Sequence, residues 1–156
     1  MPIDKNDPNV ARESRVNPQR DVVILGLINF DNSILLVRTT RFPDHWQPIG
    51  GGMRESDKSP IDAVKRELKE ESHIDLPLSK IQFEIETKYD FGKGKVYFYT
   101  ARLQPDVVLK FDKSEINEWR WFKIKDALSL KMFPATRKFI EHLLHRMEGK
   151  LTSESS

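Results

Sequence analysis

The chain has 156 residues, enough for one domain to bury a hydrophobic core without disulfides or a structural metal. It contains no cysteine, which excludes a disulfide framework, a thiolate metal site and a cysteine nucleophile. Its 26 basic and 24 acidic side chains nearly cancel, so the net charge of +2 argues against binding to long nucleic acid.

Residues 1–19 are polar and have no apolar period, so we expect a flexible N-terminal arm. No segment has the apolar run of a secretory signal or of a membrane span. The sequence therefore predicts a cytoplasmic protein with no membrane partner. We expect a single domain over residues 20–149 and a disordered tail over residues 150–156.

The first predicted unit is a β-hairpin. Two apolar runs rich in branched residues, 22–28 and 33–38, flank the turn-forming residues 29–32. At least one of these strands is expected to be buried. A loop with aromatic residues then leads to the glycines 50–52, where the backbone must either turn sharply or be approached closely by another group.

A helix is predicted over residues 60–72, because Ser59 can cap it and Pro60 suits the first helical position. The later elements interleave strands and helices without a regular βαβ rhythm, which favours a mixed α/β or α+β domain over a doubly wound sheet. They are a hairpin of residues 81–87 and 95–103 with its turn at 92–94, a strand over 117–122, a short helix over 125–130 and an amphipathic closing helix over 134–147.

Three carboxylates converge on one face of the helix over residues 60–72. At about 100° per residue, Glu67, Glu70 and Glu71 fall within an arc of roughly 100°. Like charges at this spacing oppose helix formation, and a divalent cation removes that repulsion. Oxygen ligands of this kind suit Mg²⁺ or Mn²⁺. The alternative is a solvated helix face on which Lys65 and Lys69 are the charge partners.

The sequence around this helix resembles the signature of the Nudix (MutT-like) family, Gx5Ex7REUxEExGU, in which U is a bulky aliphatic residue. Gly52 begins the pattern, the block 66–71 follows in register and Ile74 ends it, so seven of the nine specified positions match. The motif covers residues 52–74, and a looser likeness extends over about 21–147. The resemblance implies a Nudix α/β/α sandwich with a mixed central sheet.

The resemblance also implies a pyrophosphohydrolase that acts on acid anhydrides. Such an enzyme would use Mg²⁺ or Mn²⁺ to cleave a diphosphate linkage in a nucleoside diphosphate-X or nucleoside triphosphate substrate. In the family, the residues matching Glu67, Glu70 and Glu71 bind the metal, and the backbone at Gly52 would add a carbonyl ligand. Glu67, Glu70 and Arg66 are the expected catalytic residues, with Arg66 bracing the loop or the glutamates by a forked ion pair. Homodimers in the family make a dimer possible.

Two positions depart from the signature. Lys58 stands where the pattern has a glutamate, and a cation there cannot bind metal. It could pair with a substrate phosphate or with Glu71, and Glu55 or Asp57 in the same loop could replace the missing carboxylate. His73 stands where glycine normally ends the helix, and we expect it to adopt the left-handed conformation at some energetic cost.

Further site residues are proposed outside the helix. Glu118 is preferred over Glu115 as a late carboxylate ligand, because relatives often place an acidic residue before an aromatic pair. Aromatic residues near the glycines could stack a base, although such residues are more often part of the core. The predicted substrate contacts are Arg38, Trp46, Lys58 and Tyr89.

Two other function classes remain open. Lys58 could mark a catalytically weakened Nudix-fold module that binds nucleotides or another protein. A sugar-nucleotide glycosyl hydrolase is also compatible with an altered signature, since a fold does not fix a function. Because a degraded site would be expected to lose its carboxylate cluster as well, the sequence favours the pyrophosphohydrolase.

Overall fold

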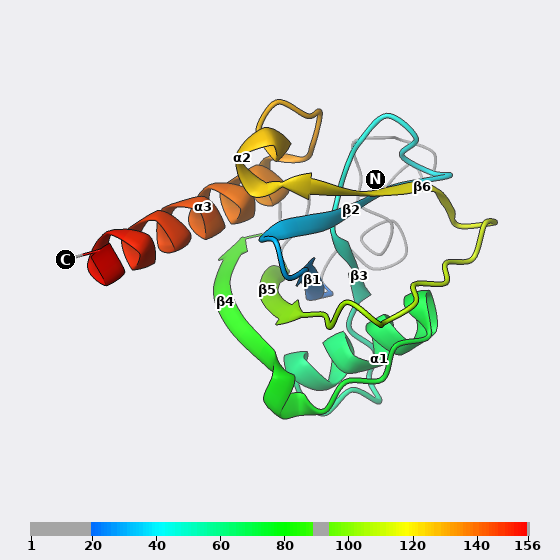
Figure 1. Ribbon diagram of the computed structural model, residues 1–156. Coiled ribbons are helices and arrows are strands. Elements are labelled where there is room, and N and C mark those ends of the chain that lie inside the picture. Colours follow the sequence, from blue (N-terminus) through cyan, green and yellow to red (C-terminus); the bar gives the residue numbers. More distant parts are fainter. Residues whose placement is uncertain (1–19, 89–93, 156) are drawn as a thin grey trace.

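The computed structural model describes residues 20–88 and 94–155 (Figure 1). The expected arm over residues 1–19 and the proposed contact Tyr89 lie outside these ranges. The elements are β1 (Val22–Ile28), β2 (Ser33–Thr39), β3 (Ile49–Gly52), α1 (Pro60–Ser72), the 3-10 helix η1 (Leu78–Lys80), β4 (Ile81–Lys88), β5 (Lys95–Arg102), β6 (Ile116–Lys123), α2 (Ile124–Ala127) and α3 (Pro134–Ser155).

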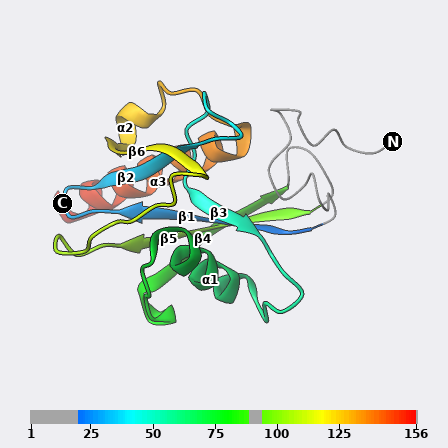
Figure 2. The same ribbon diagram turned by 90° about the vertical axis from the view of Figure 1, so that its right-hand side faces the viewer.

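The strands form one mixed sheet in the order β4-β5-β1-β2-β6, with β3 also pairing with β1. The β1–β5 pairing is parallel, and the other pairings are antiparallel. Helix α1 covers one face of the sheet, while α2 and α3 cover the other (Figure 2). This arrangement confirms the predicted α/β/α sandwich with a mixed central sheet.

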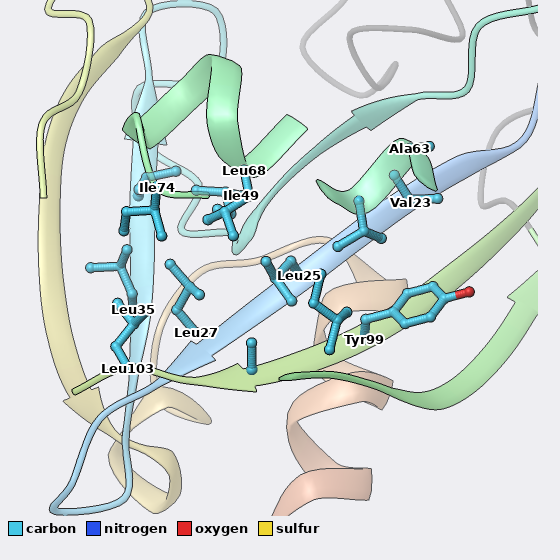
Figure 3. Close-up of a cluster of buried hydrophobic side chains, with 14 of the residues drawn as sticks. Val23, Leu25, Leu27, Leu35, Ile49, Ala63, Leu68, Ile74, Tyr99 and Leu103 are labelled. Atoms are coloured by element: carbon cyan, nitrogen blue, oxygen red, sulfur yellow. The ribbon is translucent and has the colours of Figure 1, made fainter. Parts of the chain in front are cut away.

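The α1 side of the sheet holds the first hydrophobic cluster. Val23, Leu25 and Leu27 alternate along β1 toward this face and pack with Ala63 and Leu68 of α1 (Figure 3). All five side chains are almost fully buried. Burial of a Val or Leu side chain contributes roughly 1.5–3 kcal/mol, so this cluster fixes α1 against the sheet.

The α3 side holds the second cluster, to which the other face of β1 contributes. Phe139 of α3 stacks on Phe98 of β5 with ring centroids 4.5 Å apart. A Cβ atom at Gly26 would lie 3.0 Å from Phe139 and 3.1 Å from Ile34, so glycine at this position leaves room for the phenylalanine ring. This close packing fixes the distance between α3 and the sheet.

The β1–β2 hairpin forms as predicted. The side chain of Asn29 accepts hydrogen bonds from the backbone N–H groups of Asp31 and Ser33, at 3.1 and 2.9 Å. Asn32 takes a positive φ of 62°, which asparagine tolerates better than most residues. Both strands are largely buried, so the expectation of at least one buried strand is met.

The glycines 50–52, to which the sequence assigns no element, belong to strand β3, because β1 approaches them closely enough to form a ladder. Two helices end at other residues than predicted. Helix α2 ends at Ala127, where residues 128–130 continue as turns. Helix α3 continues past the expected end near 147 to Ser155, since Gly149 weakens a helix without ending it.

Helix α3 is also held at its middle by a buried carboxylate. Glu84 of β4 accepts hydrogen bonds from Arg146 and Thr100 and contacts His142. A register shift in the β4–β5 ladder between Phe83 and Ile85 accompanies this arrangement. Although α3 is long, no helix in the described ranges is apolar enough over a sufficient length to cross a membrane.

Candidate active site

Strand β3 brings two glycines close to neighbouring groups, so that an added Cβ atom would force a shift at either position. A Cβ atom at Gly50 would lie 2.3 Å from the backbone oxygen of Val23, and one at Gly51 would lie 2.4 Å from Oε1 of Glu67. The first contact allows β3 to pair with β1, and the second lets the carboxylate of Glu67 rest directly on the strand. The expectation that another group approaches the glycines closely is therefore confirmed.

Helix α1 spans the predicted residues and supplies the acidic face. Ser59 is extended and Pro60 occupies the first turn, while the Ser59 hydroxyl donates to Asp62 at 2.7 Å and makes no cap bond to the backbone. His73 ends the helix in the left-handed conformation, with φ 61° and ψ 22°, and its N–H donates to Lys69 O. The prediction that histidine takes the place of the terminal glycine is confirmed.

Arg66 joins the glutamates to strand β3. Its Nη1 donates to Glu67 at 3.0 Å and to Glu70 at 3.3 Å, and its Nη2 donates to the carbonyl oxygen of Gly52 at 3.2 Å. The nearby carboxylates raise the pKa of Arg66, and the largest cause is the pair of hydrogen bonds that Arg66 donates to Asp57. The arginine therefore stays protonated and holds two carboxylates and one carbonyl around a single point.

Asp57 completes the arrangement from the loop before the helix. It receives a forked pair of hydrogen bonds from Arg66, with Nε to Oδ1 at 2.9 Å and Nη2 to Oδ2 at 2.8 Å. The Asp57 side chain is only 5% exposed, and the guanidinium of Arg66 lowers the pKa of its carboxyl. The next residue, Lys58, is exposed. The structure thus has a carboxylate one position before the site where the signature places its glutamate.

A second arginine lies on the outer side of the acidic face. Nη1 of Arg54 donates to Oε1 of Glu70 at 2.9 Å, and Nη2 donates to Oε2 at 3.3 Å. The backbone N–H of Arg54 donates to Asp57 Oδ2 at 2.7 Å, which fixes the start of the loop. Nearby, the guanidinium of Arg20 donates to the carbonyl oxygen of Met53.

The donor atoms suit a hard divalent cation. Across the described ranges, no group of three or more His, Asp or Glu side chains is already arranged as a metal site. However, one cationic nitrogen of Arg66 contacts Glu67 and Glu70 together, and the same guanidinium contacts the Gly52 carbonyl. Carboxylate and carbonyl oxygens are the ligands that Mg²⁺ and Mn²⁺ prefer, so the predicted ligands on α1 and β3 fit such an ion.

Three proposed residues lie away from this cluster. Arg38 forms an ion pair with Glu118 and its guanidinium carbon lies 4.7 Å from the ring centroid of Trp46. Trp46 packs in the cluster on the α3 side, whereas Val37, next to Arg38, packs on the α1 side. Since successive side chains of a strand point to opposite faces, Arg38 and Glu118 face away from α1.

The other late acid, Glu115, directly precedes β6. Its backbone oxygen accepts a hydrogen bond from Thr40 N at 2.9 Å, just after the end of β2. The adjacent Ile116 packs in the cluster on the α1 side. The preference for Glu118 over Glu115 as a late ligand stays a prediction.

Comparison with known proteins agrees with the signature. A model of the NUDIX domain matches residues 17–143 of the chain. Human diphosphoinositol polyphosphate phosphohydrolase 3-alpha is 30% identical over 129 residues, which cover 81% of this chain and 76% of that protein. The human 3-beta protein matches with the same identity and coverage.

Solved structures share the fold at lower identity. The NUDIX domain of Shewanella oneidensis NrtR, complexed with ADP ribose, has a TM-score of 0.68 and 21% identity, covering 83% of this chain and 88% of that one. The Ap4A hydrolase of C. elegans in a binary complex has a TM-score of 0.68 and 19% identity, covering 82% and 98%. At these identities the similarity establishes the fold alone.

Proposed function

The chain belongs to the Nudix family, and we propose that it uses Mg²⁺ or Mn²⁺ to hydrolyse a diphosphate linkage in a densely phosphorylated small molecule. The family and its curated members make the chain a phosphohydrolase that acts on acid anhydrides. The observation that carries the finer proposal is the convergence of Glu67 and Glu70 on one nitrogen of Arg66, beside the carbonyl of Gly52.

The proposed roles follow from these contacts. Glu67, Glu70 and the Gly52 carbonyl would hold the cation, with Glu71 on the same helix as a further ligand. A divalent cation held there would polarise the diphosphate and lower the pKa of a bound water. Arg66 would keep the two glutamates and the carbonyl in place, a role supported by its 17% side-chain exposure and its hydrogen bonds to all three.

The charges around the site support a substrate rich in phosphate. Arg20 and Arg54 lie beside the glycine strand and the acidic face, and Lys58 is exposed in the same loop. Several cations in one place favour a ligand that carries several anionic groups. The human relatives are named as diphosphoinositol polyphosphate phosphohydrolases, so we infer a substrate of that type, in which a diphosphate is borne on a phosphorylated ring.

A nucleotide is the second candidate, which the sequence pattern favoured first. Stacking of a base requires an open aromatic face. Trp46 is 9% exposed and packs edge-on against Phe122, and Phe42 is buried. These two rings therefore give no support to a nucleotide, and Trp46 is not retained as a proposed contact. Lys58 stays a proposed contact to phosphate, and Arg54 is added to it.

A hydrolysis screen tests the proposal. Purified protein with Mg²⁺ would be assayed against a diphosphoinositol polyphosphate, dinucleoside polyphosphates, nucleotide sugars, nucleoside triphosphates and ADP-ribose. Glu70→Gln would be run beside Glu86→Gln, which changes an exposed glutamate paired with Lys95. We expect release of phosphate from the diphosphoinositol polyphosphate that is lost in Glu70→Gln and retained in Glu86→Gln.

Other results would reject parts of the proposal. Turnover of nucleotides alone would replace the inositol substrate by the second candidate. Release of free sugar from a nucleotide sugar would indicate the glycosyl hydrolase. Binding without turnover of any compound would indicate the non-catalytic module.

A further inference from the structure

We propose that Arg54 is a displaceable cation, which neutralises Glu70 while the site holds no metal and moves to a substrate phosphate when a metal ion binds Glu70. The proposal rests on the metal site described under the proposed function. In this role Arg54 lowers the affinity of the site for the metal and raises its affinity for the substrate.

Two arginines contact Glu70, but they are held very differently. Arg66 has 17% side-chain exposure and is fixed by Asp57, Glu67 and the Gly52 carbonyl. The side chain of Arg54 is 52% exposed, and its guanidinium is held by the two oxygens of Glu70. Of the two, Arg54 can therefore leave Glu70 without breaking the frame of the site.

The backbone of Arg54 stays in place when its side chain moves. Its N–H donates to Asp57 Oδ2 at 2.7 Å, and Asp57 is itself held by the forked bond from Arg66. The arginine is thus anchored at one end and free to rotate at the other. A long flexible side chain on a fixed backbone suits a group that must serve two partners in turn.

The charges explain why the movement would follow metal binding. Arg54 occupies both oxygens of Glu70, so a metal that uses either oxygen must compete with the guanidinium. Once a divalent cation is bound, the positive charge repels Arg54, and an incoming phosphate attracts it. The arginine is then in reach of the substrate, because it already lies on the exposed side of the acidic face.

Direct metal binding separates this role from a purely structural one. Binding of Mn²⁺ to the full chain without substrate would be followed by electron paramagnetic resonance for the wild type, Arg54→Gln and Glu70→Gln. We expect Arg54→Gln to bind Mn²⁺ roughly two- to fivefold more tightly, the range that loss of an exposed ion pair allows. Binding of methylenediphosphonate in the presence of Mn²⁺ should weaken about tenfold in the same variant, as for loss of a charged hydrogen-bond donor.

Two controls sharpen the result. Arg120→Gln removes an exposed arginine whose Nε lies 2.7 Å from Glu118, and it should change neither affinity. Arg54→Lys keeps the charge but loses the fork, so it should retain part of the affinity for methylenediphosphonate. Thermal unfolding of each variant would verify that it is folded.

The outcomes distinguish the two proposals. Unchanged or weaker Mn²⁺ binding in Arg54→Gln, with Glu70→Gln still impaired, would overturn the displacement of Arg54 and leave the metal site standing. Unchanged Mn²⁺ binding in Glu70→Gln would overturn both. Tighter Mn²⁺ binding with unchanged methylenediphosphonate binding would overturn the transfer of Arg54 to phosphate.

Discussion

Arg146 of α3 forms a two-point ion pair with Glu84 of β4, with Nε 2.8 Å from Oε1 and Nη2 2.9 Å from Oε2. The Glu84 side chain is only 1% exposed. Thr100 donates to the same carboxylate at 2.6 Å, and Nε2 of His142 lies 3.1 Å from it. A buried carboxylate with this many partners links the long helix to the sheet.

Replacement of Glu84 by glutamine should therefore destabilise the fold. The change keeps the shape of the side chain but removes the charge that Arg146 faces, and we expect a loss of about 1–3 kcal/mol in the free energy of unfolding. Urea denaturation would measure it. Glu86→Gln, in which an exposed pair with Lys95 at 3.4 Å is lost, should lower the free energy of unfolding far less, because water screens the pair. Equal losses in both variants would show that the buried network around Glu84 stabilises the fold no more than the exposed pair does.

The stability of the protein should depend on the ionisation of Asp57. Arg66 lowers the pKa of this carboxyl in the folded state below its usual 3.8, so the ionised form stabilises the fold above that pH. As pH falls from 3.8 through the lowered folded-state pKa, this contribution is lost. In Asp57→Asn, the free energy of unfolding should therefore decrease less steeply as the pH falls below 3.8. An unaltered slope would contradict the role of the Asp57–Arg66 pair.

The glycines of β3 should respond differently to the same substitution. In Gly50→Ala the new methyl group meets the backbone of Val23, which cannot move, and we expect a loss of about 1–3 kcal/mol. In Gly51→Ala the methyl group meets the end of the Glu67 side chain, which can rotate away. Gly51→Ala should thus lower kcat strongly with a stability loss below about 1 kcal/mol. Full activity in Gly51→Ala would show that the position of Glu67 is not critical.

His73→Gly should stabilise the protein. Histidine carries strain in the left-handed conformation at the end of α1, and glycine relieves it at the cost of a more flexible unfolded chain. We expect a net gain of about 0.5–1 kcal/mol by thermal unfolding, without loss of hydrolysis. Asn32→Gly, at a similar φ of 62°, should change stability less, because asparagine accepts this conformation. A loss of stability in His73→Gly would point to a favourable contact of the imidazole.

The elements that sequence predicts best are those with strong local signals. Ser59 and Pro60 mark the start of α1, and the apolar run of branched residues in β1 marks a strand. The sequence assigns no strand to the glycines of β3, since glycine weakens a strand and only the approach of β1 explains its use there. Periodicity also could not give the length of α3, because the polar residues after Met147 carry no apolar signal.

In the candidate site, too, the sequence predicts some features, and others are visible only in the fold. The spacing of Glu67 and Glu70 on a helix predicts that they share a face, and Arg66 holds them together. The sequence names Asp57 as a possible substitute for the signature glutamate, but only the fold shows its forked bond with Arg66. Glu118 was preferred for its neighbours in sequence, whereas the direction of its side chain depends on the register of β6 against β2.

The parallel pairing of β1 with β5 has a consequence for how the site is made. Every residue from Val22 to Ile28 pairs with a partner more than seventy positions later, between Val96 and Arg102. A fragment that ends at Ser72 holds the whole glycine strand and the acidic helix, yet it lacks the strand that closes the other side of β1. The residues of the signature therefore reach their final arrangement only after β5 has been added to the sheet. A transplanted peptide of this region would carry the motif without the sheet that positions it.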